Sequence, residues 1–186
     1  LAMGCVSSSE FLESRLLEAG THLVKLAITP LTPITASWSD LLPSAYHTSV
    51  SVDDVEFSFG PGGVVRTQNF LSHRLLNSGP GPAVLLELGV SCISGAALFE
   101  ALWPHFKEGT YDLLRKNCNS FSDAAIFYLM GTQLDPKYKA LDRAAASMDS
   151  LVGLVQLLSM RNYTPNPKAE DFQMSKVMSI LNRTTL

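Results

Sequence analysis

Basic residues are few in this chain of 186 residues, and they are scattered along it. Lys and Arg together number 14 against 17 Asp and Glu, which gives a formal net charge of −3. The longest basic run is the pair Arg115 and Lys116. A nucleic-acid-binding protein normally carries a basic stripe or patch. The composition therefore argues against nucleic acid as a partner.

Cysteine is also scarce, with three residues at Cys5, Cys92 and Cys118. This odd, sparse set contains no Cys-x-x-Cys pair and no His/Cys cluster at zinc-ligand spacing, so it excludes a disulfide framework and a structural zinc site. We expect no metal and no cofactor, and a reducing, cytosolic compartment. Cys92 follows an apolar segment, and we expect it to be a buried or half-buried structural thiol.

Long apolar runs are missing too. No stretch reaches the roughly 18 residues that cross a bilayer, and no secretory signal core is present. Residues 3–8 nevertheless match the pattern for myristoylation of Gly4 once Met3 is removed, and we interpret the two preceding residues as an expression remnant. Myristate alone binds membranes marginally, with K on the order of 10⁴ M⁻¹, so a second acyl chain on Cys5 would be needed for stable anchoring. A coincidental Met-Gly start is the alternative.

The residues that are present indicate one globular α+β domain, since 46% are hydrophobic and 17% charged. Apolar patterning predicts strands at 22–29, 45–52, 55–59, 64–67 and 83–88, the last of them buried. Helical spacing and cap residues predict helices at 94–103, 118–130, a short one after 136, 148–158 and 174–181. Strands followed by helices are typical of an α+β fold. We expect an acylation segment and lead-in at 1–21, the domain at 22–162 and a helical tail at 163–186.

Two groups of residues are expected to serve packing or the surface. The tail stripe, whose apolar members include Val177 and Leu181, should pack back on the domain or a neighbour, and a partner-binding helix is the alternative. His22, His73 and His105 lack a nearby partner motif, and we expect them at the surface or rim.

The most informative stretch is Asn117-Cys118-Asn119, which opens a predicted helix ending at Gly131. A thiol in the first turn faces free N–H groups and the positive end of the helix dipole, which favour a thiolate. Upstream, His47 lies on a predicted strand, on the face that also carries small polar side chains. A cysteine and a histidine that meet in the fold are the minimal set for thiol nucleophilic catalysis. We expect a Cys118 thiolate paired with a protonated His47.

Supporting roles are predicted for the flanking residues. Asn117 and Asn119 could add donors for an oxyanion, although Asn117 is also a preferred helix cap. The turn formed by Gly60, Gly62 and Gly63 would let a narrow, extended substrate tail pass close to the backbone, and a plain tight turn is the alternative.

Three sequence blocks carry a resemblance to a known family. They are residues 46–50 (Tyr-His-Thr-Ser-Val), residues 56–63 (Glu-Phe-Ser-Phe-Gly-Pro-Gly-Gly) and residues 117–121 (Asn-Cys-Asn-Ser-Phe). In this order they resemble the PPPDE, or DeSI-like, family of cysteine peptidases over about residues 24–158. The resemblance implies a circularly permuted papain-like α+β fold, a small antiparallel sheet or half-barrel packed on helices. It also implies His47 as general base and Cys118 as nucleophile.

The family resemblance further implies removal of ubiquitin or a ubiquitin-like modifier such as SUMO from lysines, with the conjugates as partners. Some family members are linked to cleavage of S-acyl thioesters, so a protein depalmitoylase with the same dyad is an alternative. A membrane-tethered binding module without catalysis is a third hypothesis. The oligomeric state is left open, with a homodimer among the possibilities.

Attachment to the cytosolic face of a membrane is directly testable. Protein made in cells from the native start should float with membranes, and Gly4→Ala should move it to the soluble fraction, because the acyl acceptor is lost. Membrane flotation with a Ser7→Ala control measures this. A Gly4→Ala protein that still floats would overturn the acylation hypothesis.

Overall fold

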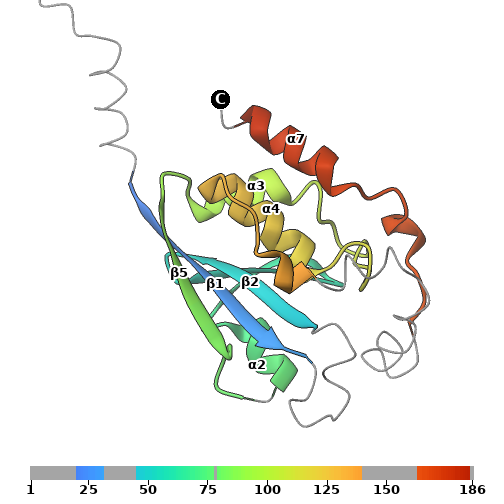
Figure 1. The fold of residues 1–186 in the computed structure, drawn as a ribbon, viewed down its shortest axis with the longest axis horizontal. Helices are drawn as coiled ribbons and strands as arrows, with labels where there is room; N and C mark the ends of the chain where they lie inside the picture. Colours follow the sequence, from blue (N-terminus) through green and yellow to red (C-terminus); the bar gives the residue numbers. More distant parts are fainter. Residues whose placement is uncertain (1–19, 32–44, 78, 140–162, 185–186) are drawn as a thin grey trace, which may run out of the picture.

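The computed structural model describes residues 20–31, 45–77, 79–139 and 163–184. Over these ranges it shows a five-stranded antiparallel sheet with helices on both faces, which confirms the predicted α+β class (Figure 1). The strands are β1 (His22–Pro30), β2 (Tyr46–Val52), β3 (Val55–Gly60), β4 (Gly63–Gln68) and β5 (Val84–Ser91). The helices are α2 (Leu71–Asn77), α3 (Gly95–Leu102), α4 (Cys118–Met130), α7 (Met174–Thr184) and the short 3₁₀ helices η1 (Pro136–Lys139) and η2 (Pro167–Ala169).

Neighbouring strands are joined in the order β4-β3-β2-β1-β5. The predicted acidic turn between β2 and β3 is confirmed, since Asp53 and Asp54 have φ values of 49° and 66°. Positive φ at both central residues matches the twist of a tight hairpin, and Asp tolerates this conformation better than most residues. The predicted helix from Cys118 to the left-handed cap Gly131, with φ of 67°, is also confirmed.

The sheet opens between β2 and β3 at one end. Their ladder runs from Val52 opposite Val55 to Val50 opposite Phe57, whereas β2 stays paired with β1 as far as Tyr46. The first residues of β2 therefore lie beyond its ladder with β3. His47 lies in this stretch.

The hydrophobic core lies between the sheet and helices α3 and α4. Val50 and Phe57 project from the sheet, and Leu98, Phe121 and Leu129 project from the helices. Helix α2 covers the opposite face of the sheet (Figure 1). That second face carries polar side chains, which is consistent with the alternation predicted for β2.

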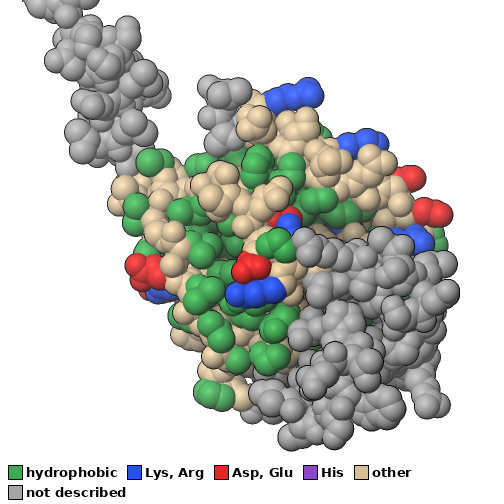
Figure 2. All heavy atoms as spheres, in the orientation of Figure 1, with side chains coloured by type: hydrophobic (Ala, Val, Ile, Leu, Met, Phe, Trp, Pro, Cys, Tyr) green, Lys and Arg blue, Asp and Glu red, His purple; other side chains and the backbone are tan. Residues whose placement is uncertain are grey.

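Strand β5 is exposed, and the prediction that it is buried was wrong. Val84, Leu85 and Val90 are 45%, 46% and 61% exposed. The strand lies at the edge of the sheet and pairs with β1, so its apolar side chains are not enclosed by a second neighbour. Figure 2 shows hydrophobic side chains at the surface on this side of the molecule.

The tail helix α7 packs against α4, as predicted for its apolar stripe. Val177 and Leu181 are buried in the same core cluster as Phe121. The predicted helix over 148–158 and the acylation segment with Gly4 and Cys5 lie outside the described residues. No helix in the described ranges is long and apolar enough to cross a membrane.

Docking of α7 predicts a measurable contribution to stability. Leu181 is 1% exposed, so Leu181→Ala should lower the free energy of unfolding by about 2–4 kcal/mol through lost burial and a new cavity. Arg183→Ala, an exposed change in the same helix, should alter it by less than about 0.5 kcal/mol. Urea unfolding of both variants measures this. Equal effects would contradict the packing of α7 on the core.

Candidate active site

The start of α4 is held by a capping box. The Asn117 side-chain oxygen accepts from the backbone N–H groups of Asn119 and Ser120 at 2.9 and 3.0 Å, and Ser120 Oγ receives the Asn117 N–H. The Asn117 side-chain amide nitrogen donates to the Leu113 carbonyl oxygen at 3.0 Å. The cap interpretation of Asn117 is therefore confirmed. In this arrangement its amide serves the helix end.

Cys118 is the first residue of α4, as predicted, and its side chain is 5% exposed. Its Sγ lies 3.8 Å from Asn119 Oδ1. The positive end of the helix dipole and the backbone N–H groups of the first turn favour negative charge at this position. The location suits a nucleophilic thiol.

Asn119 clamps the start of α4 to strand β2. Its Nδ2 donates to the Tyr46 carbonyl at 3.1 Å, and its Oδ1 accepts from Thr48 Oγ1 at 2.8 Å. Both partners flank His47 in the chain. The residue after the candidate nucleophile is therefore bonded to both neighbours of the candidate base. With both ends of its amide engaged, Asn119 acts here as a positioning residue.

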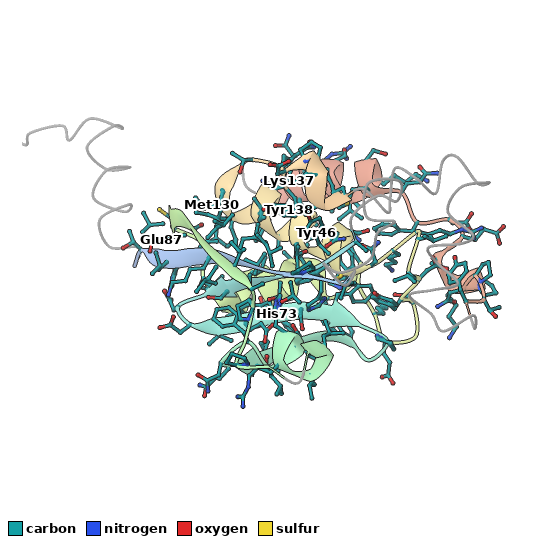
Figure 3. All side chains as sticks on the ribbon, turned by 60° about the horizontal axis from the view of Figure 1, so that its bottom comes forward. Tyr46, His73, Glu87, Met130, Lys137 and Tyr138 are labelled. Carbon is teal, nitrogen blue, oxygen red and sulfur yellow. The ribbon has the colours of Figure 1, made fainter. Side chains whose placement is uncertain are left out.

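The His47 ring faces the polar side of the sheet, as predicted. Its Nε2 lies 2.7 Å from Ser72 Oγ of α2, and the ring centroid is 4.5 Å from that of His73. Figure 3 shows His73 on the α2 side of the sheet and Tyr46 on the α4 side. The bond to Ser72 leaves Nδ1 as the ring nitrogen for a second partner. Pairing of that nitrogen with Cys118 Sγ stays a prediction.

His73 is fully buried, so its predicted place at the surface or rim was wrong. Its Nδ1 lies 2.8 Å from Thr29 Oγ1, and its Nε2 lies 2.9 Å from Ser49 Oγ. The partners come from strands 24 and 44 residues away in sequence. Helix α2, which turns His73 inward, was not predicted either, because its own leucines Leu71 and Leu75 are exposed and give no core pattern.

Glu56 lies buried beneath both histidines and was missed by the sequence reasoning. Its carboxylate accepts from Ser72 Oγ and Thr67 Oγ1, each at 2.5 Å, and from the Ser72 backbone N–H at 3.3 Å. Burial acts to raise the pKa of Glu56. The hydrogen bonds from Ser72, Thr67 and Ser49 outweigh it and bring that pKa below its usual value. Glu56 is therefore a carboxylate at neutral pH.

Both buried histidines are held in the neutral form. Burial, with a further contribution from neighbouring His73, lowers the pKa of His47 to about 3, although Glu56 opposes this. Burial lowers the pKa of His73 to about 4, again against the pull of Glu56. The resting His47 is thus a neutral imidazole, which differs from the imidazolium that the sequence suggested.

The predicted glycine turn is confirmed as the tip of the β3–β4 hairpin. Gly60 pairs with Gly63, whose φ is +87° and whose missing Cβ would lie 2.8 Å from the Glu108 backbone nitrogen. The turn borders a groove of about 390 Å³. The groove is lined by His47, Ser58, Phe59, Gly60, Pro61, Gly62, Gly63, Val65, Ser72, Leu75, Leu76 and Tyr111.

The loop before α4 is held by contacts of the charged Lys116 side chain, which the sequence reasoning also missed. The Lys116 ammonium lies 5.0–5.9 Å from the ring centroids of Phe59, Phe106 and Phe172 and donates to Thr110 Oγ1 at 2.9 Å. Such cation–π contacts stabilise a cation taken out of water. Burial lowers the pKa of Lys116. These contacts hold the residues leading into Cys118.

The other thiol in the described residues is not part of this site. Cys92 is exposed directly after β5, so its predicted burial was wrong. Cys92 directly follows β5, which is an edge strand of the sheet. Within the described ranges, no group of three His, Cys, Asp or Glu side chains is placed to hold a metal ion.

The buried neutral histidines predict a pH dependence of stability. The unfolded-state pKa is about 6.5 and the folded values are about 3 and 4, so the unfolded chain binds more protons between them. Stability should fall as the pH drops below 6.5, by about 3 kcal/mol between pH 8 and pH 5.5. Glu56 contributes little in this range, because a glutamate is already ionised there in the unfolded chain and its pKa is lowered further on folding.

Urea unfolding at pH 8 and pH 5.5 measures this loss in the free energy of unfolding. The half-buried His105 provides a control, because His105→Gln should retain most of the difference. Equal free energies of unfolding at the two pH values would contradict the buried, neutral state of His47 and His73.

The family model described as the PPPDE putative peptidase domain matches residues 23–157, which is more than half of the chain. The matched segment contains the sheet, the Asn119 clamp and both His47 and Cys118. This chain therefore belongs to the PPPDE putative peptidase family.

Proposed function

We propose that this protein is a cysteine isopeptidase that removes ubiquitin or a ubiquitin-like modifier such as SUMO from lysine side chains. Cys118 is the nucleophile and His47 the general base in this proposal. The Asn119 clamp is the observation that carries it, because it fastens the helix start bearing the thiol to the strand residues on both sides of the imidazole.

In the proposed reaction His47 begins as the neutral imidazole. The neutral His47 imidazole takes the proton from Cys118 Sγ as the sulfur attacks the isopeptide carbonyl carbon. The carbonyl oxygen becomes an oxyanion, for which the Cys118 backbone N–H at the helix start is our candidate donor. Losing one such donor typically lowers the rate by about 10²–10³.

Collapse of the tetrahedral intermediate breaks the carbon–nitrogen bond. The His47 imidazolium gives its proton to the departing lysine ε-amine, which leaves the modifier joined to Cys118 as a thioester. His47, neutral again, then takes a proton from water as that water attacks the thioester. Cys118 leaves as the thiol after receiving the proton from His47, and the modifier is released as a carboxylic acid.

The groove beside His47 supports an extended substrate. Gly60, Gly62 and Gly63 of the turn border it without side chains, so a narrow Gly-Gly tail could lie against the backbone there. The chain order, with the histidine strand before the cysteine helix, supports the permuted papain-like arrangement. Acylation at Gly4 and Cys5 would place this groove at the cytosolic face of a membrane.

A second candidate is hydrolysis of a protein S-acyl thioester at the same dyad. The observation in its favour is the apolar part of the groove, where Val65, Leu75 and Leu76 could hold an acyl chain. A thiolate leaves more readily than an amine, so this reaction needs less proton donation by His47.

Activity-based labelling tests the assignment. Ubiquitin and SUMO bearing a C-terminal electrophile should label the wild-type protein at Cys118, and Cys118→Ala should abolish the label. Cys92→Ser removes the exposed thiol and is the matched control, which should label normally. His47→Gln should slow labelling by about 10²-fold or more through loss of the base. Intact-mass and peptide mass spectrometry measure both.

A fluorogenic acyl thioester assayed alongside separates the candidates. Turnover of the thioester without labelling by either modifier would favour the thioesterase. Labelling that persists in Cys118→Ala would contradict the nucleophile assignment. Failure of both reactions in folded protein would favour a binding module.

A further inference from the structure

We propose that Ser72 and Glu56 are positioning residues that fix the tautomer of His47, so that Nδ1 is its proton-accepting nitrogen. The inference deepens the proposed function, on which the role of Nδ1 toward Cys118 rests. A hydrogen-bonded chain runs from His47 through Ser72 to Glu56.

The Ser72 hydroxyl has a single proton to donate. Its Oγ donates to Glu56 Oε1 at 2.5 Å, because an ionised carboxylate can only accept. The same oxygen lies 2.7 Å from His47 Nε2, so it must act there as the acceptor. His47 Nε2 therefore carries the hydrogen. In a neutral imidazole the other nitrogen, Nδ1, then holds the free lone pair.

Glu56 is suited to fix this direction because its acceptor positions are filled by donors. Thr67 Oγ1 and the Ser72 backbone N–H reach Oε2, and Ser72 Oγ reaches Oε1. Ser49 also contributes to the lowered pKa of Glu56. The backbone N–H can only donate, and together these hydrogen bonds favour the carboxylate over the protonated acid.

Both ring nitrogens of His73 are engaged by hydroxyl groups, Nε2 with Ser49 Oγ at 2.9 Å and Nδ1 with Thr29 Oγ1 at 2.8 Å. Burial lowers the pKa of His73 and keeps it neutral, and its ring lies against that of His47 without competing for Ser72. Among the described residues, His73 of α2 and Glu56 of β3 are the groups whose charge acts on the pKa of His47.

The chain also has a role after proton transfer. When Nδ1 takes the thiol proton, the positive charge on His47 is stabilised through Ser72 by the Glu56 carboxylate. No proton needs to pass to Ser72 or Glu56 in this step. Their function is orientation and electrostatic support, comparable to the third residue of other catalytic triads.

The tautomer of His47 can be observed directly by long-range ¹H–¹⁵N NMR at pH 7. The wild-type protein should show the Nε2–H form. Ser72→Ala should give a mixture of tautomers, and Ser72→Thr, which keeps the hydroxyl, should restore Nε2–H. Glu56→Gln should lower the Nε2–H fraction, because an amide can donate toward Ser72. Ser51→Ala is the matched control, since the Ser51 hydroxyl has no hydrogen-bond partner among the described residues.

Kinetics with the substrate that the protein turns over provide the second readout. Ser72→Ala should lower kcat by about 10- to 100-fold with KM within about twofold, and Ser72→Thr should recover most of the loss. A loss of stability alone would not change the His47 tautomer, so the NMR readout separates the positioning role from a structural one. Equal kcat losses in Ser72→Thr and Ser72→Ala would overturn the positioning role.

The two proposals fail separately. A wild-type His47 with Nδ1–H, or a tautomer unchanged in both Ser72→Ala and Glu56→Gln, overturns this inference even if the enzyme is active. The predicted tautomers without any reaction at Cys118 would uphold the Ser72 and Glu56 assignment and overturn the proposed function.

Discussion

The arrangement of the site depends on the two-ended hydrogen bonding of the Asn119 amide. One end binds the Tyr46 carbonyl and the other the Thr48 hydroxyl, so the amide spans the strand position of His47. Asn119 is almost fully buried, and an unpaired amide there would carry a penalty of about 1–3 kcal/mol per lost group. The start of α4 cannot shift along β2 without incurring that penalty. The position of the Cys118 thiol relative to strand β2, which carries His47, is therefore fixed.

The polar layer beneath His47 is the second constraint. Burying a carboxylate and two imidazoles is unfavourable unless each group is hydrogen-bonded. Glu56 and His73 meet that condition through hydroxyl groups on β1, β2, β4 and α2. Ser72 and Thr67 both donate to this carboxylate, so this part of the network has one direction of proton donation. In our proposal this direction fixes the tautomer of His47, whereas a solvated histidine would exchange tautomers.

The sequence predicted the features that local patterns encode and missed those that depend on distant partners. Alternation and turn residues located the strands, and Asn117 located the helix start with Cys118 at its first position. His73 was misplaced because its hydroxyl partners lie on separate strands and α2 has no apolar stripe facing the core. Glu56 opens one of the three sequence blocks and Ser72 lies outside them, but neither position indicates a role, since only the folded sheet brings them under His47. The exposure of β5 likewise depends on its edge position, which apolar content cannot reveal.

The central claim is that Nδ1 of His47 and the sulfur of Cys118 meet across the opening between β2 and β3. Treatment with 1,3-dibromoacetone, which alkylates a thiol and then a neighbouring imidazole, tests it most directly. The account predicts a single bridge between the peptides carrying Cys118 and His47, attached to Nδ1. A bridge from Cys118 to another residue, or alkylation of Cys118 at one end of the reagent without closure, would contradict it.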